Sequence, residues 1–267
     1  MAPKGKSKQK SGCSKSCMVE VKTEIRKALA EELEDKVAVI GVTDEDIATS
    51  AIPTGNVLTS TNFIKLLPNI SSGVGQYNFR DGNEIRLKEL DIKMLLNFAL
   101  SDLSTATNED AGVGVRVMIL RQKDQNSQTG ALSDFQGDKL LENGAIVTPG
   151  PSSFAGNTFN LVQHINREQF SVRYDKVFYL DATYRQASGG ATTVSQTFLP
   201  PKTVVMQKKL RFGKNGLKLT FGNKASDEPT NFPYFMVLGV ASTVSNSVPS
   251  NDLIRYSYSS NARYTDA

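Results

Sequence analysis

The segment 83–98 constrains the fold of this chain more than any other. Its apolar residues alternate with polar ones at Ile85 and Leu87 and, after a slip of one residue at Lys88–Glu89, alternate again over 90–98. Alternation with a period of two is typical of a strand that buries one face. A slip would turn every later side chain to the opposite face unless the strand takes up one extra residue. We therefore expect a strand with a β-bulge at Lys88–Glu89; the alternative is a helix over the same segment.

Further strand patterns follow along the chain, separated by turn-rich segments of uneven length. They lie at 57–67, 112–121, 159–165, 170–180, 203–212, 217–221, 234–242 and 253–264. The Val-rich segment 112–121 is apolar enough to be buried on both faces. About eight main strands with long connections favour an all-β fold, an eight-stranded antiparallel jelly-roll sandwich.

Two of the connections carry their own predictions. Asn215-Gly216 stands between two alternating runs, which is a strong signal for a β-hairpin joining 203–212 to 217–221. A phosphate-binding loop at the same place is a poor alternative, because the Walker spacing is missing. The segment 123–157 is long and turn-rich, with a possible short helix at 134–142. A connection of that length is typical of an interaction surface.

The N-terminal part is predicted to be a basic arm, then a helix, then a linker. Residues 1–17 are rich in Lys, Ser and Gly and cannot bury enough apolar surface to order themselves, so we expect disorder. Apolar residues spaced three and four apart predict a short amphipathic helix over 18–36. Its acidic last turns oppose the helix dipole, so it needs a partner, either its own domain or a neighbouring subunit. Residues 37–52 are predicted to be a linker. The domains expected are 1–17, 18–50 and 51–267.

The positive charge of the chain is concentrated in two segments. Residues 1–17 carry five lysines without an acid, and residues 187–226 carry seven cations without an acid. Because the net charge of the whole chain is +4, all other residues together carry −8. This segregation indicates a polyanionic partner for the two basic segments. A solubilising tail or a nuclear-import signal is the alternative for the arm.

Several classes of function find no support in the sequence. His164 is the only histidine, and no Gly-x-Ser-x-Gly elbow or dinucleotide-binding fingerprint occurs. Cys13 and Cys17 are the only cysteines, too few for a structural zinc site, which needs four ligands. We therefore expect no enzyme activity, no catalytic residue, no metal and no cofactor. The apolar runs are shorter than a membrane span requires, and the lysine-rich start lacks the apolar core of a secretory signal.

At this point the order of features resembles a known family. A Lys-rich arm precedes a long β domain with Gly73-Val74-Gly75-Gln76, then the segment 80–88 (RDGNEIRLK), then 115–120 (VRVMIL). Near the end come 233–239 (PYFMVLG) and a Ser-Tyr-rich strand ending at 263–266 (RYTD). This pattern resembles the single jelly-roll capsid proteins of small circular Rep-encoding single-stranded DNA viruses, which are circovirus-like and also similar to satellite plant RNA virus capsids.

The resemblance implies a virion component that self-assembles into an icosahedral capsid, most simply a T=1 shell of about sixty copies. It implies that the arm lies inside on a single-stranded genome, more plausibly DNA than RNA, and that assembly takes place in the host nucleus. It names no attachment factor on the host. The arm of this chain departs from the family by containing no arginine, which leaves the strength of packaging open.

The candidate nucleic-acid-binding residues follow from the two basic segments. They are Lys4, Lys6, Lys8, Lys10 and Lys15 in the arm, and Lys208, Lys209, Arg211 and Lys214 in and after the strand at 203–212. For the second group, a solvated outer face or a subunit contact is an equal alternative. Two other functions stay open: a monomeric β-sandwich module that binds carbohydrate or nucleic acid, and a hydrolase that uses acidic residues.

Overall fold

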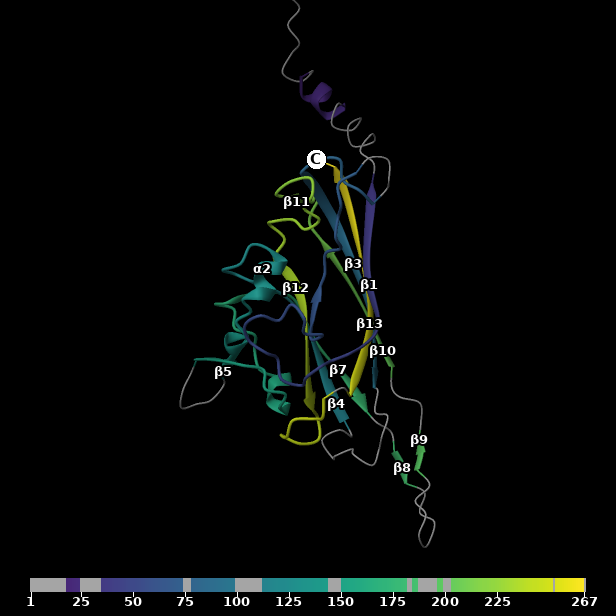
Figure 1. The fold of residues 1–267 in the computed structure, drawn as a ribbon, viewed down its shortest axis with the longest axis vertical. Coiled ribbons are helices and arrows are strands. Elements are labelled where there is room, and N and C mark those ends of the chain that lie inside the picture. Colours follow the sequence, from purple (N-terminus) through teal and green to yellow (C-terminus); the bar gives the residue numbers. More distant parts are fainter. Residues whose placement is uncertain are drawn as a thin grey trace, which may run out of the picture.

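The fold is built from two antiparallel sheets, which Figure 1 shows on either side of a common core. In this computed structural model, the described residues are 18–24, 35–73, 78–98, 112–143, 150–181, 184–186, 196–198, 203–251 and 253–266. The β3 sheet has the strand order β1 (Lys36–Asp46), β13 (Ile254–Asp266), β3 (Glu84–Phe98) and β10 (Thr203–Arg211), with β11 (Leu217–Thr220) also paired to β3. The β4 sheet has the order β2 (Phe63–Lys65), β12 (Tyr234–Ser242), β4 (Gly112–Gln122) and β7 (Phe170–Asp181).

This strand order is that of a jelly roll, so the predicted fold class is confirmed. Along the chain the main strands alternate between the two sheets, except that β4 and β7 follow each other in one sheet. Every pair is antiparallel. The smaller elements are α2 (Gln128–Ser133), η2 (Gly137–Lys139), β5 (Leu141–Asn143), β6 (Gly150–Ser152), η3 (Thr158–Leu161), β8 (Tyr184–Gln186) and β9 (Gln196–Phe198). Residues 18–24 are helical and exposed.

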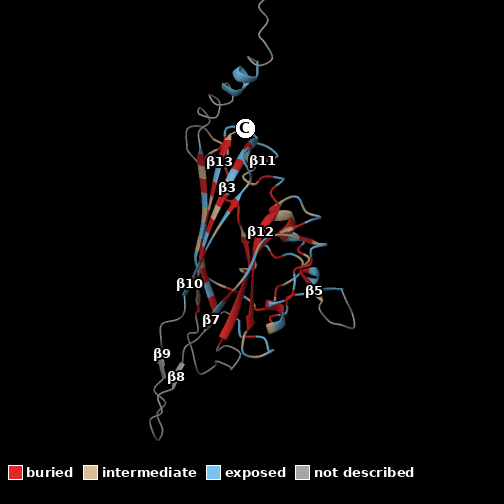
Figure 2. Ribbon diagram, turned by 180° about the vertical axis from the view of Figure 1, so that it is seen from behind, coloured by how far each residue is buried: buried red, intermediate tan, exposed pale blue. Residues whose placement is uncertain are grey.

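The core consists of two apolar clusters, one on each face of the β4 sheet. The larger cluster lies between the two sheets. The second lies between the β4 sheet and the connection 123–169, which contributes Phe135, Leu140 and Phe154. Because both its faces are covered, β12 is buried along its length, and β4 nearly so (Figure 2). The prediction that 112–121 is buried on both faces is confirmed, and Phe135, Leu140 and Phe154 of the long connection point inward.

The predicted bulge in β3 is confirmed at Lys88. Arg263 of β13 pairs with Glu89, and the next residue, Tyr264, pairs with Leu87, so Lys88 is the extra residue. Leu87 and Leu90 are therefore both fully buried although they are three positions apart. The bulge restores the inward face that the slip in the alternation would otherwise have lost.

The predicted hairpin at Asn215-Gly216 is wrong. Strands β10 and β11 both pair with β3, one after the other along the same edge, instead of pairing with each other. The intervening residues leave the ladder in a loop whose Gly213 and Gly216 have φ of 77° and 68°. A Cβ atom on Gly216 would lie 2.8 Å from the carbonyl oxygen of Leu87, so only glycine fits this close approach. The turn residues were read correctly, but the long partner β3 can pair with both segments.

Five other sequence predictions require correction. The predicted linker at 37–52 contains β1, which pairs with β13 at the edge of the β3 sheet. The helix predicted over 18–36 cannot reach Lys36, because β1 begins there. The strand expected at 159–165 is replaced by η3, and the helix expected at 134–142 by η2 and β5. Of the strand expected at 57–67, only β2 forms.

Candidate nucleic-acid interface

The predicted nucleic-acid-binding residues do not form one surface. The five arm lysines (Lys4, Lys6, Lys8, Lys10 and Lys15) lie outside the described residues, so their role remains a prediction. On β10 the side chains alternate: Met206 and Leu210 enter the core between the sheets, and Lys208 lies on the same face between them. Lys209 and Arg211 lie on the opposite, outer face of the β3 sheet. Lys214 is exposed in the loop after β10.

The outer face of the β3 sheet places acids beside these outward cations. Lys209 Nζ lies 3.4 Å from Glu89 Oε1 and 3.5 Å from Asp91 Oδ2, and Arg211 Nε lies 3.0 Å from Glu89 Oε2. The hydrogen bond from Arg211, together with the charge of Lys209, lowers the pKa of Glu89 below its ordinary value. The charges of Lys209 and Arg211 are therefore partly neutralised by Glu89 and Asp91. This face carries mixed charge and is not a purely basic patch.

A different set of cations lines the opening between the two sheets. Strand β7 is the edge of the β4 sheet and β10 is the edge of the β3 sheet, and the two edges face each other. We call this opening the β7–β10 mouth and define it by Arg173, Tyr174, Lys176, Lys208, Phe212 and Tyr234. Arg173, Lys176 and Lys208 have no carboxylate within ion-pair distance among the residues that the structure describes.

Each of these three cations lies over an aromatic ring. Lys208 Nζ is 5.2 Å from the centre of the Tyr174 ring, and Lys176 Nζ is 4.9 Å from the centre of the Phe178 ring. Arg173 Cζ is 5.2 Å from the centre of the Tyr234 ring. Contacts of this kind stabilise a cation without neutralising its charge. The mouth therefore keeps three full positive charges in fixed positions.

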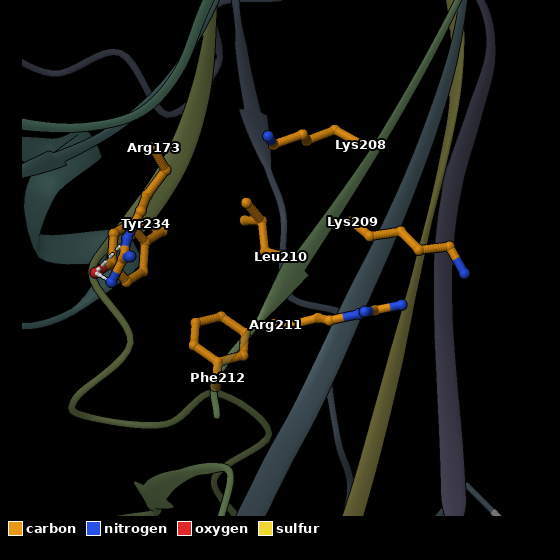
Figure 3. Close-up of a pocket in the computed structure, with 7 residues that line it drawn as sticks. All are labelled: Arg173, Lys208, Lys209, Leu210, Arg211, Phe212 and Tyr234. Atoms are coloured by element: carbon orange, nitrogen blue, oxygen red, sulfur yellow. Dashed lines mark hydrogen bonds between the residues drawn. The ribbon is translucent and has the colours of Figure 1, made fainter. Parts of the chain in front are cut away.

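A pocket of about 200 Å³ opens at one end of the mouth. Its lining residues are Arg173, Lys208, Lys209, Leu210, Arg211, Phe212 and Tyr234, of which Lys209 and Arg211 direct their charged ends away from the mouth. Figure 3 shows Lys208 reaching from β10 toward the side of Arg173 and Tyr234, whereas Lys209 and Arg211 point away over the β3 sheet. Arg173 donates from Nε and Nη2 to the Tyr234 hydroxyl at 3.2 and 2.9 Å. Burial raises the pKa of Tyr174 above its ordinary value, so the ring under Lys208 stays neutral.

One more arginine lies on the same face of the β4 sheet. Arg121 of β4 is directly opposite Tyr234 in the ladder, so the two side chains share a face. Its Nε is buried and has no hydrogen-bond partner within the described part of the chain. A buried donor without a partner is unfavourable by about 1–3 kcal/mol. A bound acceptor near this end of the sheet would remove that penalty.

The sequence reasoning missed Arg173, Lys176 and Arg121. The signal for Arg173 and Lys176 was present in the segment 170–180 (FSVRYDKVFYL), where cations interrupt an otherwise apolar and aromatic strand, and Arg121 ends the apolar segment 112–121. That pattern could not show that the strand lies at an edge facing β10. The same limit explains why Lys208 was grouped with Lys209 and Arg211, which point the other way.

Other kinds of site find no geometry in the described residues. No group of three or more His, Cys, Asp or Glu side chains there could hold a metal ion. His164, the only histidine, is exposed. No helix in the described part of the chain is long and apolar enough to cross a membrane.

Comparisons with known proteins leave the chain without an assigned family. No protein-family model matches it, and no curated protein matches it. Among solved structures, VP1 of Trichodysplasia spinulosa-associated polyomavirus in complex with GM1 oligosaccharide is 8% identical over 86% of this chain and 94% of its own, with a TM-score of 0.27. VP1 of Merkel cell polyomavirus in complex with GD1a oligosaccharide is 8% identical over 87% of this chain and 95% of its own, with a TM-score of 0.17. Similarity this low assigns neither a family nor a ligand, and the jelly roll rests on the strand order alone.

Proposed function

We propose that this chain is a viral capsid protein that self-assembles into a small icosahedral shell around a single-stranded genome. The observation that carries the proposal is the complete jelly-roll order of the two sheets, in a chain whose first 17 residues hold five lysines and no acid. Jelly rolls of this kind occur in viral capsids, lectins and cupins. A cupin-type metal site would need several histidines, and this chain has one.

A contact surface for self-assembly is available at one end of the sandwich. Four exposed apolar side chains belong to η3, its C-cap and the loop after β12, and we call them the end patch: Phe159, Val162, Val244 and Val248. Thr158 fixes η3 to the loop after β12, because its hydroxyl donates to the carbonyl oxygens of Ser242 and Ser245. An exposed apolar cluster on an ordered support fits a contact between copies of the chain.

The proposed packaging mechanism is electrostatic. The arm lysines would displace counterions from phosphates, which gives binding that is independent of sequence and falls steeply with salt. About sixty arms would bring only about 300 charges, fewer than a genome of a few thousand nucleotides carries. Cations of the jelly roll itself would then have to contribute. The simplest form of the proposal is a T=1 particle with a DNA genome that assembles in the host nucleus.

A monomeric nucleic-acid-binding module is the second candidate. The observation that favours it is the β7–β10 mouth, whose cations and rings lie within one copy of the chain. Such a module needs no neighbouring copy. The two candidates therefore differ in size in solution and not in the chemistry of the mouth.

Electron microscopy of the recombinant protein tests the proposal. The full chain is imaged in negative stain beside a version lacking residues 1–17, and the absorbance ratio at 260 and 280 nm is measured. Uniform spheres that contain nucleic acid only when the arm is present support the shell and the packaging arm. Empty spheres from both versions would support the shell and contradict the proposed role of the arm in packaging. A protein that stays monomeric across salt, pH and added nucleic acid contradicts the shell and favours the monomeric module.

A further inference from the structure

We propose that the β7–β10 mouth binds the phosphate groups of a single-stranded nucleic acid, with Arg173 and Lys208 on one phosphate and Lys176 on the next. This inference rests on the proposed function and identifies which part of the jelly roll contacts the genome. It moves the interface away from Lys209 and Arg211. The supporting observations are the absence of paired acids, the free hydrogen-bond donors, the size of the pocket and the spacing along β7.

The distribution of acids separates the mouth from Lys209 and Arg211 on the outer face of the β3 sheet. On the outer face of the β3 sheet, Lys209 and Arg211 have Glu89 and Asp91 as partners. On β7 itself the only acid near the mouth, Asp175, is held by both prongs of Arg116 at 2.8 and 2.6 Å. An approaching phosphate therefore meets uncompensated charge at Arg173, Lys176 and Lys208.

The cations of the mouth keep donors available for a ligand. Arg173 uses Nε and Nη2 on the Tyr234 hydroxyl, which leaves Nη1 without a partner among the described residues. The ammonium groups of Lys208 and Lys176 donate no hydrogen bond to another described residue. The rings hold the side chains in place, so less rotamer freedom is lost on binding than for an exposed lysine. A preset guanidinium fork beside an ammonium group suits a phosphate.

The size of the pocket excludes a large ligand. Pockets for drug-sized molecules measure about 300–1,000 Å³, whereas this one measures about 200 Å³. It is lined by charged and aromatic side chains, with Leu210 as its only aliphatic residue. A phosphate group with part of its sugar fits this volume and lining. The rest of a longer ligand would lie outside, along β7.

The spacing along β7 favours a polymer over a single ion. Lys176 follows Arg173 by three residues, which corresponds to about 10 Å along a strand. Because Arg173 lies over Tyr234 and Lys176 over Phe178, the two charges are held apart along the strand, which suits successive phosphates of a chain.

The test compares two double variants of the full chain. Arg173→Gln with Lys208→Gln removes the first phosphate contact, and Lys209→Gln with Arg211→Gln removes two cations from the outer face as the matched control. Binding of a fluorescent 20-nucleotide oligo-dT is measured by anisotropy between about 50 and 300 mM salt. The first variant should lower the magnitude of the slope of log K against log salt by about 0.7, since Arg173 and Lys208 share one phosphate and each lost phosphate contact on a single strand removes about 0.7. The control should keep the wild-type slope.

Each other result overturns the proposal in a recognisable way. If the mouth variant keeps the wild-type slope, the mouth does not bind the oligonucleotide. If the control variant loses as much slope as the mouth variant, the outer face of the β3 sheet contributes to binding. Inorganic phosphate is the second probe, read by thermal shift. If it raises Tm of the wild type but not of the mouth variant while the oligo-dT slope stays unchanged, the site takes free phosphate and not nucleic acid. If the mouth variant loses assembly but keeps its slope, the mouth is a contact between copies.

The result does not depend on whether the chain forms a shell. Anisotropy is accompanied by sedimentation of the same samples, which reports the assembly state directly. If the protein is monomeric and the mouth variant shows the expected loss of slope, the phosphate site is supported and the proposed shell is contradicted. Unfolding curves of both double variants confirm that they fold, and the exposed position of Arg173 makes a loss of the fold unexpected.

Discussion

Arg116 of β4 and Asp175 of β7 form a two-pronged ion pair that is buried on one side only. Arg116 Nε and Nη2 donate to the two carboxylate oxygens of Asp175 at 2.8 and 2.6 Å, and Nη1 donates to the carbonyl oxygen of Asn160 at 2.6 Å. The Arg116 side chain is 4% exposed, whereas that of Asp175 is 31% exposed. The pair joins two strands of the β4 sheet to η3.

Because of this difference in exposure, we expect replacement of Asp175 to lower the free energy of unfolding more than replacement of Arg116 does. Asp175→Ala leaves a guanidinium buried without its counterion and should lower the free energy of unfolding by about 3 kcal/mol. Arg116→Met leaves a carboxylate that water can reach and one carbonyl without its donor, which should cost about 1 kcal/mol. Urea unfolding of both variants measures the difference. Equal losses, or a larger loss for Arg116→Met, would contradict the account.

Arg80 should tolerate lysine poorly although the charge is kept. Its side chain is fully buried and lies 4.0 Å over the Phe221 ring. Nε and Nη2 donate to the carbonyl oxygens of Ile70, Asn223 and Ser226 at 3.2, 2.9 and 2.6 Å. A lysine has one nitrogen and cannot reach carbonyls in several directions. We expect Arg80→Lys to lower the free energy of unfolding by about 3 kcal/mol.

The control for this prediction is Arg86→Lys. Arg86 is exposed on β3, so its replacement should stay within about 0.5 kcal/mol of the wild type. Thermal unfolding measures both variants, and limited proteolysis shows whether the loop 222–228 opens in Arg80→Lys. Equal stability of the two variants would show that the Arg80 contacts contribute nothing particular.

The strands of the sandwich could be predicted because local alternation reports burial directly. The segment 234–242 has the bounds of β12, and the slip in 83–98 identified the bulge at Lys88. The pairing of strands could not be predicted in the same way. Both 203–211 and 217–220 look like the arms of a hairpin, and only the length of β3 decides that they lie end to end. Pairing is a property of distant segments, and a local turn signal does not contain it.

The candidate site shows the same division between local and distant information. Lys208 was selected for its charge, correctly placed on a strand and wrongly grouped with its neighbours. Alternation on β10 already implied that Lys208 and Lys209 face opposite sides. That Lys208 meets Arg173 required the edge of a second sheet, from a segment 35 residues earlier in the chain.

Deletion of Lys88 tests the bulge. Without this residue the alternation runs unbroken from Ile85 and Leu87 through Glu89 to Leu90, so the apolar residues keep the inward face and the pairing with β13 needs no bulge. We expect the deletion variant to keep a cooperative unfolding transition by circular dichroism. Lys88→Ala keeps the backbone and removes only the exposed ion pair with Asp35, so it should cost less than about 0.5 kcal/mol. Loss of the unfolding transition in the deletion variant would contradict the assignment of Lys88 as the extra residue of the bulge.

The stability of the chain should fall in acid partly through Glu228. Burial alone would raise the pKa of Glu228, but the hydrogen bonds from Lys65 and Thr129 outweigh it, and the pKa lies below its ordinary value. The unfolded chain therefore binds a proton at a higher pH than the folded chain does. The stabilisation is present above about pH 4.5 and is lost as the pH falls through the folded pKa.

Unfolding in urea between about pH 3 and pH 7 measures this dependence. Glu228→Gln should be less stable than the wild type at neutral pH, and the difference should shrink in acid. Glu168→Gln, at an exposed carboxylate without an ion pair among the described residues, is the control and should run parallel to the wild type. A gap between Glu228→Gln and the wild type that stays constant across this range would contradict the prediction.

Replacement of apolar residues in the end patch should impair assembly without unfolding the chain. Phe159 and Val162 are 51% and 68% exposed, so Phe159→Ser with Val162→Ser removes apolar surface that water already reaches. The free energy of unfolding should change by less than about 1 kcal/mol for the pair, while the fraction of protein in shells or large oligomers should fall sharply. Val205→Ser is the matched control, because Val205 is 71% exposed on the outer face of the β3 sheet, away from η3. Sedimentation and negative-stain images of the full chain give the readout. An end-patch variant that assembles as well as the wild type would exclude this surface as a contact between copies, and a loss of assembly in Val205→Ser alone would move that contact to the β3 sheet.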